Sequence, residues 1–339
     1  MNEKYHAAII GCGNIAGKHD EEKKAITGTF SHAGAYTKNN IEIVAAADPN
    51  VSRLAEFGAY WKVKNTYSDY QELLKKENPD ILSICTPDKT HYPVIKQVLR
   101  INPPAVIFAE KPLAETTEKI QEILSTAKKA GTRIVVDYQR RWDPDHMQAR
   151  EIIHTGKLGT LQAVNVSYVK GIQHNGCAAV NTLQFLIDDI IKVIAIPPYD
   201  VGTFPDDPSL DAVLFFRNGA KAILQSCDKQ GYSYSIFEID ILGNDGRIRL
   251  VDNGESMITY QKEPYHSYAG FFELVETDRN KTGMPFALEY AVKAITEILD
   301  QKKKQYKNSG MESYKDMLVI ESILQSKDSG GIITDVPGT

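Results

Sequence analysis

Residues 8–17 read Ala-Ile-Ile-Gly-Cys-Gly-Asn-Ile-Ala-Gly, an apolar strand that runs directly into a glycine turn. Gly11 permits a tight turn, and Gly13 has no Cβ, so a phosphate can approach its backbone and the start of the following helix. Ala16 stands where the third glycine of this pattern usually lies, a replacement that the pattern allows. The stretch therefore predicts a dinucleotide-binding site. The residues of this turn expected to contact the cofactor are Gly11, Gly13, Asn14 and Ile15.

Outward from this turn, the first 138 residues alternate between apolar strands and helices. Such alternation is typical of a parallel sheet whose strands are joined by right-handed crossovers. After residue 139 long runs of β character follow, and Asn218-Gly219 between two of them predicts a tight hairpin turn. We therefore expect an α/β Rossmann domain with a parallel sheet over residues 1–138, and an α+β domain with an open, mostly antiparallel sheet over residues 139–339. The expected strands are Tyr5–Ile10, Ile41–Ala47, Asp80–Cys85, Ala105–Ala109 and Thr132–Tyr138 in the first domain, and Leu161–Val169, Leu210–Phe216, Ala220–Cys227, Ser233–Leu242, Arg247–Val251 and Met257–Gln261 in the second.

Composition argues against several classes of protein. The 339 residues are 42% hydrophobic and 24% charged, which is ordinary for a globular chain, and the net charge of −5 argues against a nucleic-acid binder. No apolar stretch reaches the roughly 18 residues that a membrane span needs, and no secretory signal is recognised at the start. The four cysteines are too scattered for a zinc site or a disulfide framework. We expect a cytoplasmic protein with reduced thiols and no bound metal, and with neither a nucleic acid nor a membrane as partner.

An acidic residue should end the second strand and bind the ribose of the cofactor. Asp48 takes this position, although it lies further from the glycines than the usual ~20 residues. The charged stretch Lys18–Lys24 and its neighbours account for the difference as an insertion. A carboxylate accepts hydrogen bonds from ribose hydroxyls and repels a 2′-phosphate, so NAD is favoured, while Arg53 nearby softens that preference and admits NADP. The alternative is that Asp48 only begins a turn before Pro49.

A second signal, Glu110-Lys111-Pro112, follows the apolar strand at residues 105–109. Ligands bind at the carboxyl ends of the strands in such folds, so we expect Lys111 in the active site, where its ammonium would stabilise negative charge on the reacting oxygen. A surface ion pair with Glu110 is the alternative. Polar surface is an equal alternative for His91, and a phosphate on the substrate is an alternative partner for Gln139 and Arg140. The further candidates for the cofactor site are Thr86, Pro87, His91, Glu110, Lys111, Gln139 and Arg140.

Together these motifs resemble those of the glucose–fructose oxidoreductase / inositol dehydrogenase / MocA (Gfo/Idh/MocA) family. The resemblance covers nearly the whole chain, and the set of motifs is far more specific than any one of them. It implies hydride transfer between a nicotinamide and a hydroxyl of a sugar, polyol or nucleotide sugar, and the style is closest to members that act on sugars or nucleotide sugars. The supporting stretches are Thr86-Pro87 with His91, Glu110-Lys111-Pro112, Arg140-Arg141-Trp142-x-Pro144, Gly156-Lys-Leu-Gly159 and Gly243…Gly246-Arg-Ile.

One motif of that family is altered in this chain. Members usually carry Gly-x-His-x-x-Asp, in which the histidine is the general base on the substrate hydroxyl and the aspartate helps to hold the substrate. The matching stretch is Gly176-Cys-Ala-Ala-Val-Asn181, so Ala178 and Asn181 stand in their places. Alanine cannot take a proton, and asparagine carries no charge. The resemblance assigns substrate contacts to Lys111, His174, Asn175, Ala178 and Asn181.

Several explanations of this change stay open. The enzyme uses another base, with Lys111 as the first catalytic candidate and His174, four residues before Ala178, as the second. Alternatively, the chain binds NAD and a ligand without turnover, or it is an inactivated dehydrogenase. A further hypothesis keeps the cofactor bound and uses transient oxidation to cleave a glycoside, as in some relatives.

The open sheet of the second domain predicts an oligomer. A broad apolar sheet face left in water would aggregate, so another copy of the chain should cover it. We therefore expect a homodimer or a homotetramer formed through that face.

Overall fold

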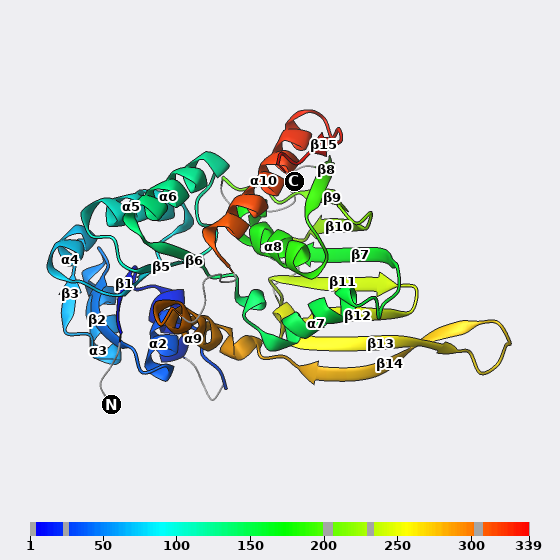
Figure 1. Cartoon of the computed structure of the whole chain (residues 1–339), viewed down its shortest axis with the longest axis horizontal. Helices are drawn as coiled ribbons and strands as arrows, with labels where there is room; N and C mark the ends of the chain where they lie inside the picture. Colours follow the sequence, from blue (N-terminus) through cyan, green and yellow to red (C-terminus); the bar gives the residue numbers. More distant parts are fainter. Residues whose placement is uncertain (1–4, 23–26, 199–205, 229–233, 302–307, 339) are drawn as a thin grey trace. The chain divides into compact units, whose positions relative to one another are not determined.

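The computed structural model covers residues 1–339 and describes all of them except 1–4, 23–26, 199–205, 229–233, 302–307 and 339. The described chain forms two compact units (Figure 1). The first unit comprises residues 1–142 and 285–314, and the second comprises residues 143–284 and 315–339. The segment 285–314 therefore returns to the unit that holds the glycine turn.

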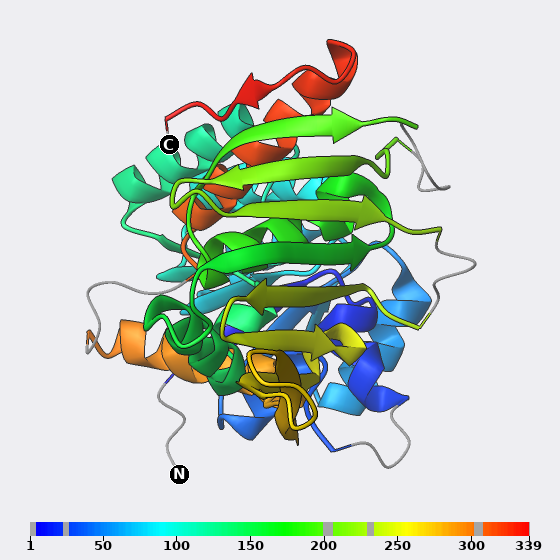
Figure 2. The same cartoon turned by 90° about the vertical axis from the view of Figure 1, so that its right-hand side faces the viewer.

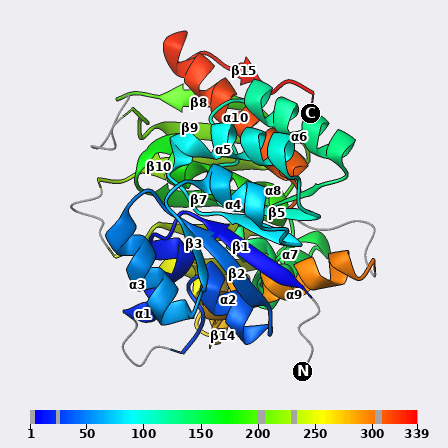
Figure 3. The same ribbon diagram turned by 90° about the vertical axis from the view of Figure 1, so that its left-hand side faces the viewer.

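A six-stranded sheet forms the centre of the first unit (Figure 3). Its strands are β1 His6–Ile10, β2 Glu42–Ala47, β3 Asn65–Tyr67, β4 Ile81–Ile84, β5 Val106–Ala109 and β6 Arg133–Val136. The strand order is β3-β2-β1-β4-β5-β6, and every pairing is parallel, as the alternation of strands and helices predicts. The order changes direction between β1 and β4, and such a switch point is where open α/β sheets bind ligands.

Helices cover both faces of this sheet, which explains why β4 and β5 are buried along their whole length. The helices are α1 His19–Glu21, α2 His32–Lys38, α3 Val51–Trp61, α4 Tyr70–Lys76, α5 Asp88–Ile101, α6 Thr117–Ala130 and α9 Ala287–Leu299, with the short turns η1 Asn14–Lys18 and η2 Gln139–Arg141. Helices α2, α3 and α9 lie on one face, and α5 and α6 lie on the other (Figure 1). Local capping fixes their ends: Thr116 accepts a hydrogen bond from the Lys119 amide at the start of α6, and Gly131 ends it at φ +75°.

The second unit is built on a nine-stranded sheet (Figure 2). Its strands are β7 Leu161–Tyr168, β8 Ile190–Ile196, β9 Asp211–Phe216, β10 Lys221–Ser226, β11 Phe237–Gly243, β12 Gly246–Val251, β13 Ser256–Pro264, β14 Phe272–Lys281 and β15 Thr334–Asp335. The order is β14-β13-β12-β11-β7-β10-β9-β8-β15, and among the described pairings β10 with β7 alone is parallel. The predicted hairpin turn joins β9 to β10, with Gly219 at φ +89°. This arrangement confirms the expected α/β plus mostly antiparallel α+β architecture.

One face of the nine-stranded sheet carries the helices α7 Pro144–His154, α8 Cys177–Leu186 and α10 Gly310–Asp328 (Figures 1 and 2). No described helix covers the other face. Strand β10 alternates accordingly, since Ala222 and Leu224 are buried while Ile223 is 49% exposed. Ile223 pairs in register with Val213, which in turn pairs with Ile194. These three residues form an apolar row across β8, β9 and β10 on the uncovered face.

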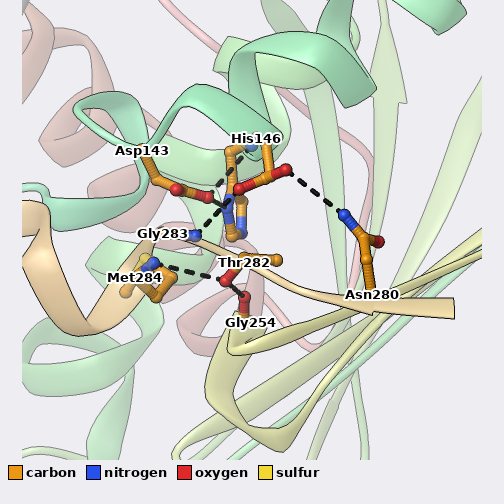
Figure 4. A network of polar contacts seen from close by, with 8 residues as sticks. Asp143, His146, Gly254, Asn280, Thr282, Gly283 and Met284 are labelled. Carbon is orange, nitrogen blue, oxygen red and sulfur yellow. Dashed lines mark hydrogen bonds and ion pairs between the residues drawn. The ribbon is translucent and has the colours of Figure 1, made fainter. Parts of the chain in front are cut away.

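A polar network ties the end of β14 to the start of α7 (Figure 4). The Asp145 carboxylate accepts hydrogen bonds from the Gly283 amide at 2.8 Å and from the Asn280 side chain at 3.3 Å. The Thr282 hydroxyl donates to the Gly254 carbonyl at 2.7 Å. Asp143 caps α7 and also binds the ring of His146, which is fully buried. The network thus has a structural role, because it links the point where the last long strand leaves the sheet to the start of α7.

The cysteines and the helices bear on two expectations, the lack of a disulfide framework and the lack of a membrane span. All four cysteines are free, which agrees with the absence of a disulfide framework. Among the described helices, none combines the length and apolar character needed to cross a bilayer.

Candidate active site

The glycine turn follows β1, and glycine suits each of its two positions, 11 and 13, for a different reason. Gly11 lies at φ +90°, and a Cβ placed on it would be 2.6 Å from the carbonyl oxygen of Cys85, so the turn is packed against the end of β4. Gly13 has extended backbone angles (φ −81°, ψ −159°) that any residue can adopt. A Cβ on Gly13 would have no described protein atom within 4 Å. The space beside Gly13 is therefore open, as the approach of a diphosphate requires.

Asp48 closes the other side of the turn. One of its carboxylate oxygens accepts a hydrogen bond from the Cys12 amide at 2.8 Å, and the other accepts one from the Asn50 amide at 2.8 Å. Its side chain is only 4% exposed, and the Arg53 guanidinium lies 3.4 Å away, half exposed. The carboxylate thus holds the shape of the turn, and ribose binding by Asp48 and Arg53 remains a prediction. Asn14 and Ile15 begin η1 directly after the turn.

The predicted residues at the ends of β4 and β5 are neighbours, because these strands pair in register at Ile84 and Ala109. His91 joins the two ends: one ring nitrogen lies 2.7 Å from the Thr86 carbonyl oxygen, and the other lies 2.7 Å from the Pro112 carbonyl oxygen. His91 is fully buried, so the predicted alternative of polar surface is wrong. Its position shows a bracing role between the segment of Thr86-Pro87 and that of Lys111-Pro112. Lys111 itself is half buried at this edge.

A buried polar atom at the same edge also fits a cofactor. The Thr86 hydroxyl oxygen is inaccessible to solvent and has no hydrogen-bond partner among the described residues. Such groups are uncommon because they lose the hydrogen bonds of water without replacement. Together with the open space at Gly13, this donor suits a bound dinucleotide, and Thr86, Pro87, Gln139 and Arg140 remain the predicted contacts on this side.

Sequence reasoning missed a buried cluster beside Lys111. Asp137 directly follows β6, whose last residue pairs with Ala109 at the end of β5, so Asp137 is a neighbour of Glu110. His32, at the start of α2, completes the group, and the ligand atoms of these three side chains lie within 4.8 Å of one another. The signal that could have revealed Asp137 is the one used for Asp48 and Glu110, a carboxylate immediately after a buried strand.

Hydrogen bonds engage both ring nitrogens of His32 within this cluster. His32 Nδ1 lies 2.8 Å from the Ser83 hydroxyl, which is in turn 2.6 Å from the Tyr36 hydroxyl, and His32 Nε2 lies 3.1 Å from Glu110. Burial lowers the pKa of His32 to about 4, so the ring is neutral near pH 7. A neutral ring that accepts from Ser83 donates its one proton to Glu110, which leaves no lone pair for a metal. The contact of His32 with Glu110 is therefore a hydrogen bond between a neutral donor and an acidic group.

The buried carboxyl group of Asp137 leads to a prediction about how the stability of the protein depends on pH. Burial, and then the nearby Glu110 carboxylate, raises the pKa of Asp137 from 3.8 to about 7. A carboxyl group whose pKa is higher in the folded than in the unfolded protein stabilises the fold at pH values below its unfolded pKa. This contribution is lost as the pH rises from about 4 through about 7. Asp137→Asn removes the buried charge, so we expect it to be more stable than the wild type at pH 8 by roughly 2–4 kcal/mol, and no more stable at pH 4.

Urea denaturation at the two pH values measures this difference. Glu72→Gln, at an exposed carboxylate on α4, is the control and should leave the stability nearly unchanged at both pH values. An Asp137→Asn variant with the same urea midpoint as the wild type at pH 8 would contradict the raised pKa.

The predicted substrate residues of the second unit lie in η3 Gly171–Gly176 and in α8. The His174 amide donates to the Asp207 carboxylate at 2.8 Å, which fixes the backbone at the start of this turn. Asn175 and Ala178 are buried. The Asn181 amide nitrogen donates to Asp316 of α10 at 2.7 Å, and Gln184 donates to the other oxygen of the same carboxylate at 2.9 Å.

Asp316 explains why position 181 suits asparagine. Its carboxylate is 1% exposed and needs donors, which Asn181 and Gln184 provide. An aspartate at 181 would place two carboxylates in hydrogen-bonding contact without a donor between them, which is strongly unfavourable in a buried site. Asparagine in place of aspartate at position 181 therefore suits the contact between α8 and α10. The two residues are 135 positions apart, so no local sequence pattern reveals this contact.

The chain resembles known oxidoreductases. Residues 5–138 match the family model described as "Oxidoreductase family, NAD-binding Rossmann fold" (GFO_IDH_MocA). D-Glucoside 3-dehydrogenase of Escherichia coli K12 is 29% identical over 230 residues, which are 66% of this chain and 60% of that protein. The chain thus spans less than two thirds of the length of that relative. Inositol 2-dehydrogenase of Salmonella paratyphi B is 25% identical over 260 residues, 72% of this chain and 73% of that protein.

A solved structure shares the fold over almost the whole chain. It is the WlbA dehydrogenase of Bordetella pertussis in complex with NADH and UDP-GlcNAcA, with a TM-score of 0.76 and 18% identity over 99% of this chain and 100% of the other. At this identity the likeness shows the fold. The family match and the geometry of the glycine turn agree that the first unit is an NAD-binding Rossmann domain.

Proposed function

We propose that this chain, whose residues 5–138 match the Gfo/Idh/MocA family model, is an NAD-dependent dehydrogenase of a sugar, polyol or nucleotide sugar. Bound NAD would supply the acceptor for the hydride that leaves the C–H of the reacting carbon. Lys111 would bind the reacting oxygen through its amine and take part in removing the hydroxyl proton, since the chain carries alanine at position 178. The curated relatives named above act, by their names, on a glucoside and on inositol, which supports this class of substrate.

The observation that carries this proposal is the packing of the glycine turn on the strand ends. Gly11 lies directly against Cys85, the residue before Thr86, and His91 links Thr86 to Pro112 beside Lys111. The open space at Gly13, the buried Thr86 hydroxyl and Lys111 therefore belong to the carboxyl edge of one sheet. A dinucleotide on the turn would extend along that edge toward the lysine.

The test is a panel of sugars, inositols and UDP-sugars assayed with NAD at pH 8 by the absorbance of NADH. Calorimetric titration with NAD and with NADP accompanies it and determines which coenzyme the chain prefers. We expect binding of NAD and oxidation of at least one compound. A protein that binds neither NAD nor NADP would contradict the proposal. Binding of a coenzyme without oxidation of any compound would favour the second candidate, a non-catalytic NAD-binding protein. Glycoside cleavage without net NADH would indicate the third hypothesis.

The second candidate is a non-catalytic NAD-binding protein, and Ala178 is the observation that favours it. The side chain cannot accept a proton, and Asn181, at the other altered position, is engaged with Asp316. Under this hypothesis the protein binds NAD tightly and oxidises nothing.

Ala178→His separates the two candidates. A histidine there restores the residue type that the family pattern carries, whereas Asn181 is kept because Asp316 needs its amide. If the chain is a disabled dehydrogenase, we expect NADH formation from the substrate panel to appear only in the variant, above a wild-type rate indistinguishable from zero. If the wild type is already active, the variant should change the rate by less than about tenfold. Ala178→Ser is the matched control, because serine has no group that titrates near neutral pH.

We also propose that the uncovered face of the nine-stranded sheet pairs with a second copy of the chain. The apolar row of Ile194, Val213 and Ile223 on this face supports the proposal. We expect light scattering to give the mass of a dimer or a tetramer. Ile223→Asp should lower that mass to one chain, because an unpaired buried charge is costly at an interface. Val51→Asp, at a side chain 68% exposed on α3, is the control. A wild type that is monomeric at micromolar concentration would contradict the proposal.

A further inference from the structure

The buried carboxyl groups of Glu110 and Asp137 are short of hydrogen-bond donors. The Glu110 side chain is 12% exposed, and Asp137 is 3% exposed. His32 reaches Glu110, and the Gln139 amide reaches one oxygen of Asp137 at 3.1 Å. The other oxygen of Asp137 is buried and has no hydrogen-bond partner among the described residues. Two carboxylates in a water-poor site with so few donors favour a state in which one proton lies between them.

The position of this pair relates it to Lys111. Glu110 precedes Lys111 in the chain, and the positive charge of Lys111 acts on the Glu110 carboxylate. A chain of hydrogen bonds that runs from Tyr36 through Ser83 to His32 also reaches Glu110. The pair thus lies next to Lys111 in the chain, at the carboxyl ends of β5 and β6.

We propose that the Glu110–Asp137 pair is the proton acceptor of the reaction: it takes up, through Lys111, the proton of the substrate hydroxyl and holds it between the two carboxyl groups. This inference rests on the proposed dehydrogenase function. It provides a destination for the proton in a chain that has alanine where its family usually has the base. Glu110 and Asp137 are positioning residues in this scheme, since Lys111 alone would touch the substrate.

The step balances in protons and electrons. The O–H bond of the substrate breaks, and its proton joins the amine of Lys111 as the lysine ammonium gives one of its own protons to the carboxylate pair. The hydrogen of the C–H bond would leave together with the bonding electron pair as a hydride, which bound NAD would accept as the oxidant, and the C–O bond would become a carbonyl. Lys111 leaves the step in the protonation state in which it entered, and the charge of the pair changes from −2 to −1.

The scheme sets the pH dependence. The pair can accept a proton only when it is fully ionised, and burial together with Glu110 raises the pKa of Asp137 to about 7. The rate of alcohol oxidation should therefore rise as the pH rises through about 7. Lys111 and His91 favour ionisation of Glu110, while Asp88 opposes it, and Cys85 faces the pair as a neutral thiol because burial keeps its pKa well above the ordinary value. The groups that face the pair are Lys111, His91, Asp88, Cys85, His32 and Gln139.

Infrared spectroscopy tests the pair in the whole protein without turnover. Spectra of the wild type between pH 5 and pH 9 should contain a protonated-carboxyl C=O band that disappears with a midpoint near neutral pH and shifts in heavy water. Asp137→Asn keeps the shape of the side chain but cannot ionise, so the band should be absent from this variant. Glu72→Gln should keep it. The absence of such a band from the wild type overturns the inference, whether or not the protein oxidises sugars.

The pH profile of kcat provides the second readout. We expect kcat of the wild type to rise through about pH 7, and kcat of Asp137→Asn to be about 100-fold lower at pH 8, without that rise and with KM nearly unchanged. Glu110→Gln should behave alike. A variant with the wild-type profile overturns the inference while the proposed function stands. A wild type that shows the band but oxidises no compound overturns both.

Discussion

Replacing Gly13 with valine is expected to abolish NAD binding in a chain that remains folded. The backbone at Gly13 is extended and suits a β-branched residue, and no described protein atom lies within 4 Å of the new Cβ. The valine side chain would therefore cost the fold little, but it would occupy the space through which a diphosphate approaches the backbone. We expect the affinity for NAD to fall at least 100-fold, roughly 2.7 kcal/mol, as measured by calorimetry.

Gly11→Ala is the informative comparison. At Gly11 the positive φ and the Cys85 carbonyl oxygen both exclude a side chain, so this variant should lose thermal stability as well as NAD. Gly13→Val should instead melt within a few degrees of the wild type. Undiminished NAD binding by a folded Gly13→Val variant would show that the cofactor lies elsewhere, and the proposed function would fail with it.

Local sequence patterns were sufficient to predict the elements whose side chains follow a simple period. The strands before Gly11, Thr86 and Glu110 were recognisable because they are short, apolar and followed by turn residues. The hairpin at Gly219 was equally plain. The stretch Ser68-Asp-Tyr-Gln71 has the pattern of a capping box and predicts Ser68 as the N-cap of the helix that follows. This prediction is wrong, since Asp69 caps α4 and accepts the hydrogen bond from the Gln71 amide. Serine and aspartate are comparable N-caps, so the local sequence does not distinguish between them.

Long-range contacts explain the strand and the site residues that could not be predicted from the sequence. Strand β14 was missed because its residues are mostly polar and exposed, and it is held by pairing with β13 rather than by a buried face. Part of the charged stretch at residues 18–24 lies outside the described residues, but Asp20 accepts a hydrogen bond from Ser31 at the start of α2. This contact helps to set His32, which then meets Glu110 across 78 positions of sequence. Nothing in the sequence near His32 or Asp316 indicates which groups they face, so those parts of the candidate site became visible only in three dimensions.

Lys111→Met should cause the largest loss of activity. Methionine is close to lysine in length and is apolar, so the variant keeps the bulk of the side chain but has no amine to bind the reacting oxygen or to pass on a proton. In a chain with alanine at position 178, no histidine is available at that place to take over, and we expect kcat to fall at least about 10³-fold. The affinity for NAD should change by less than about threefold, since the diphosphate is held at the glycine turn.

The control is Lys119→Met on α6, where the amine pairs with Glu115 and the side chain is 37% exposed. It makes the same chemical change outside the site and should leave kcat within about twofold of the wild type. If Lys111→Met retained most of the activity, the lysine would be only a surface ion pair with Glu110, and His174 would become the leading candidate for the base. His174→Ala would then have to show the loss that Lys111→Met did not. Because an imidazole and an amine titrate in different pH ranges, the pH profile of the remaining activity would also distinguish the two bases.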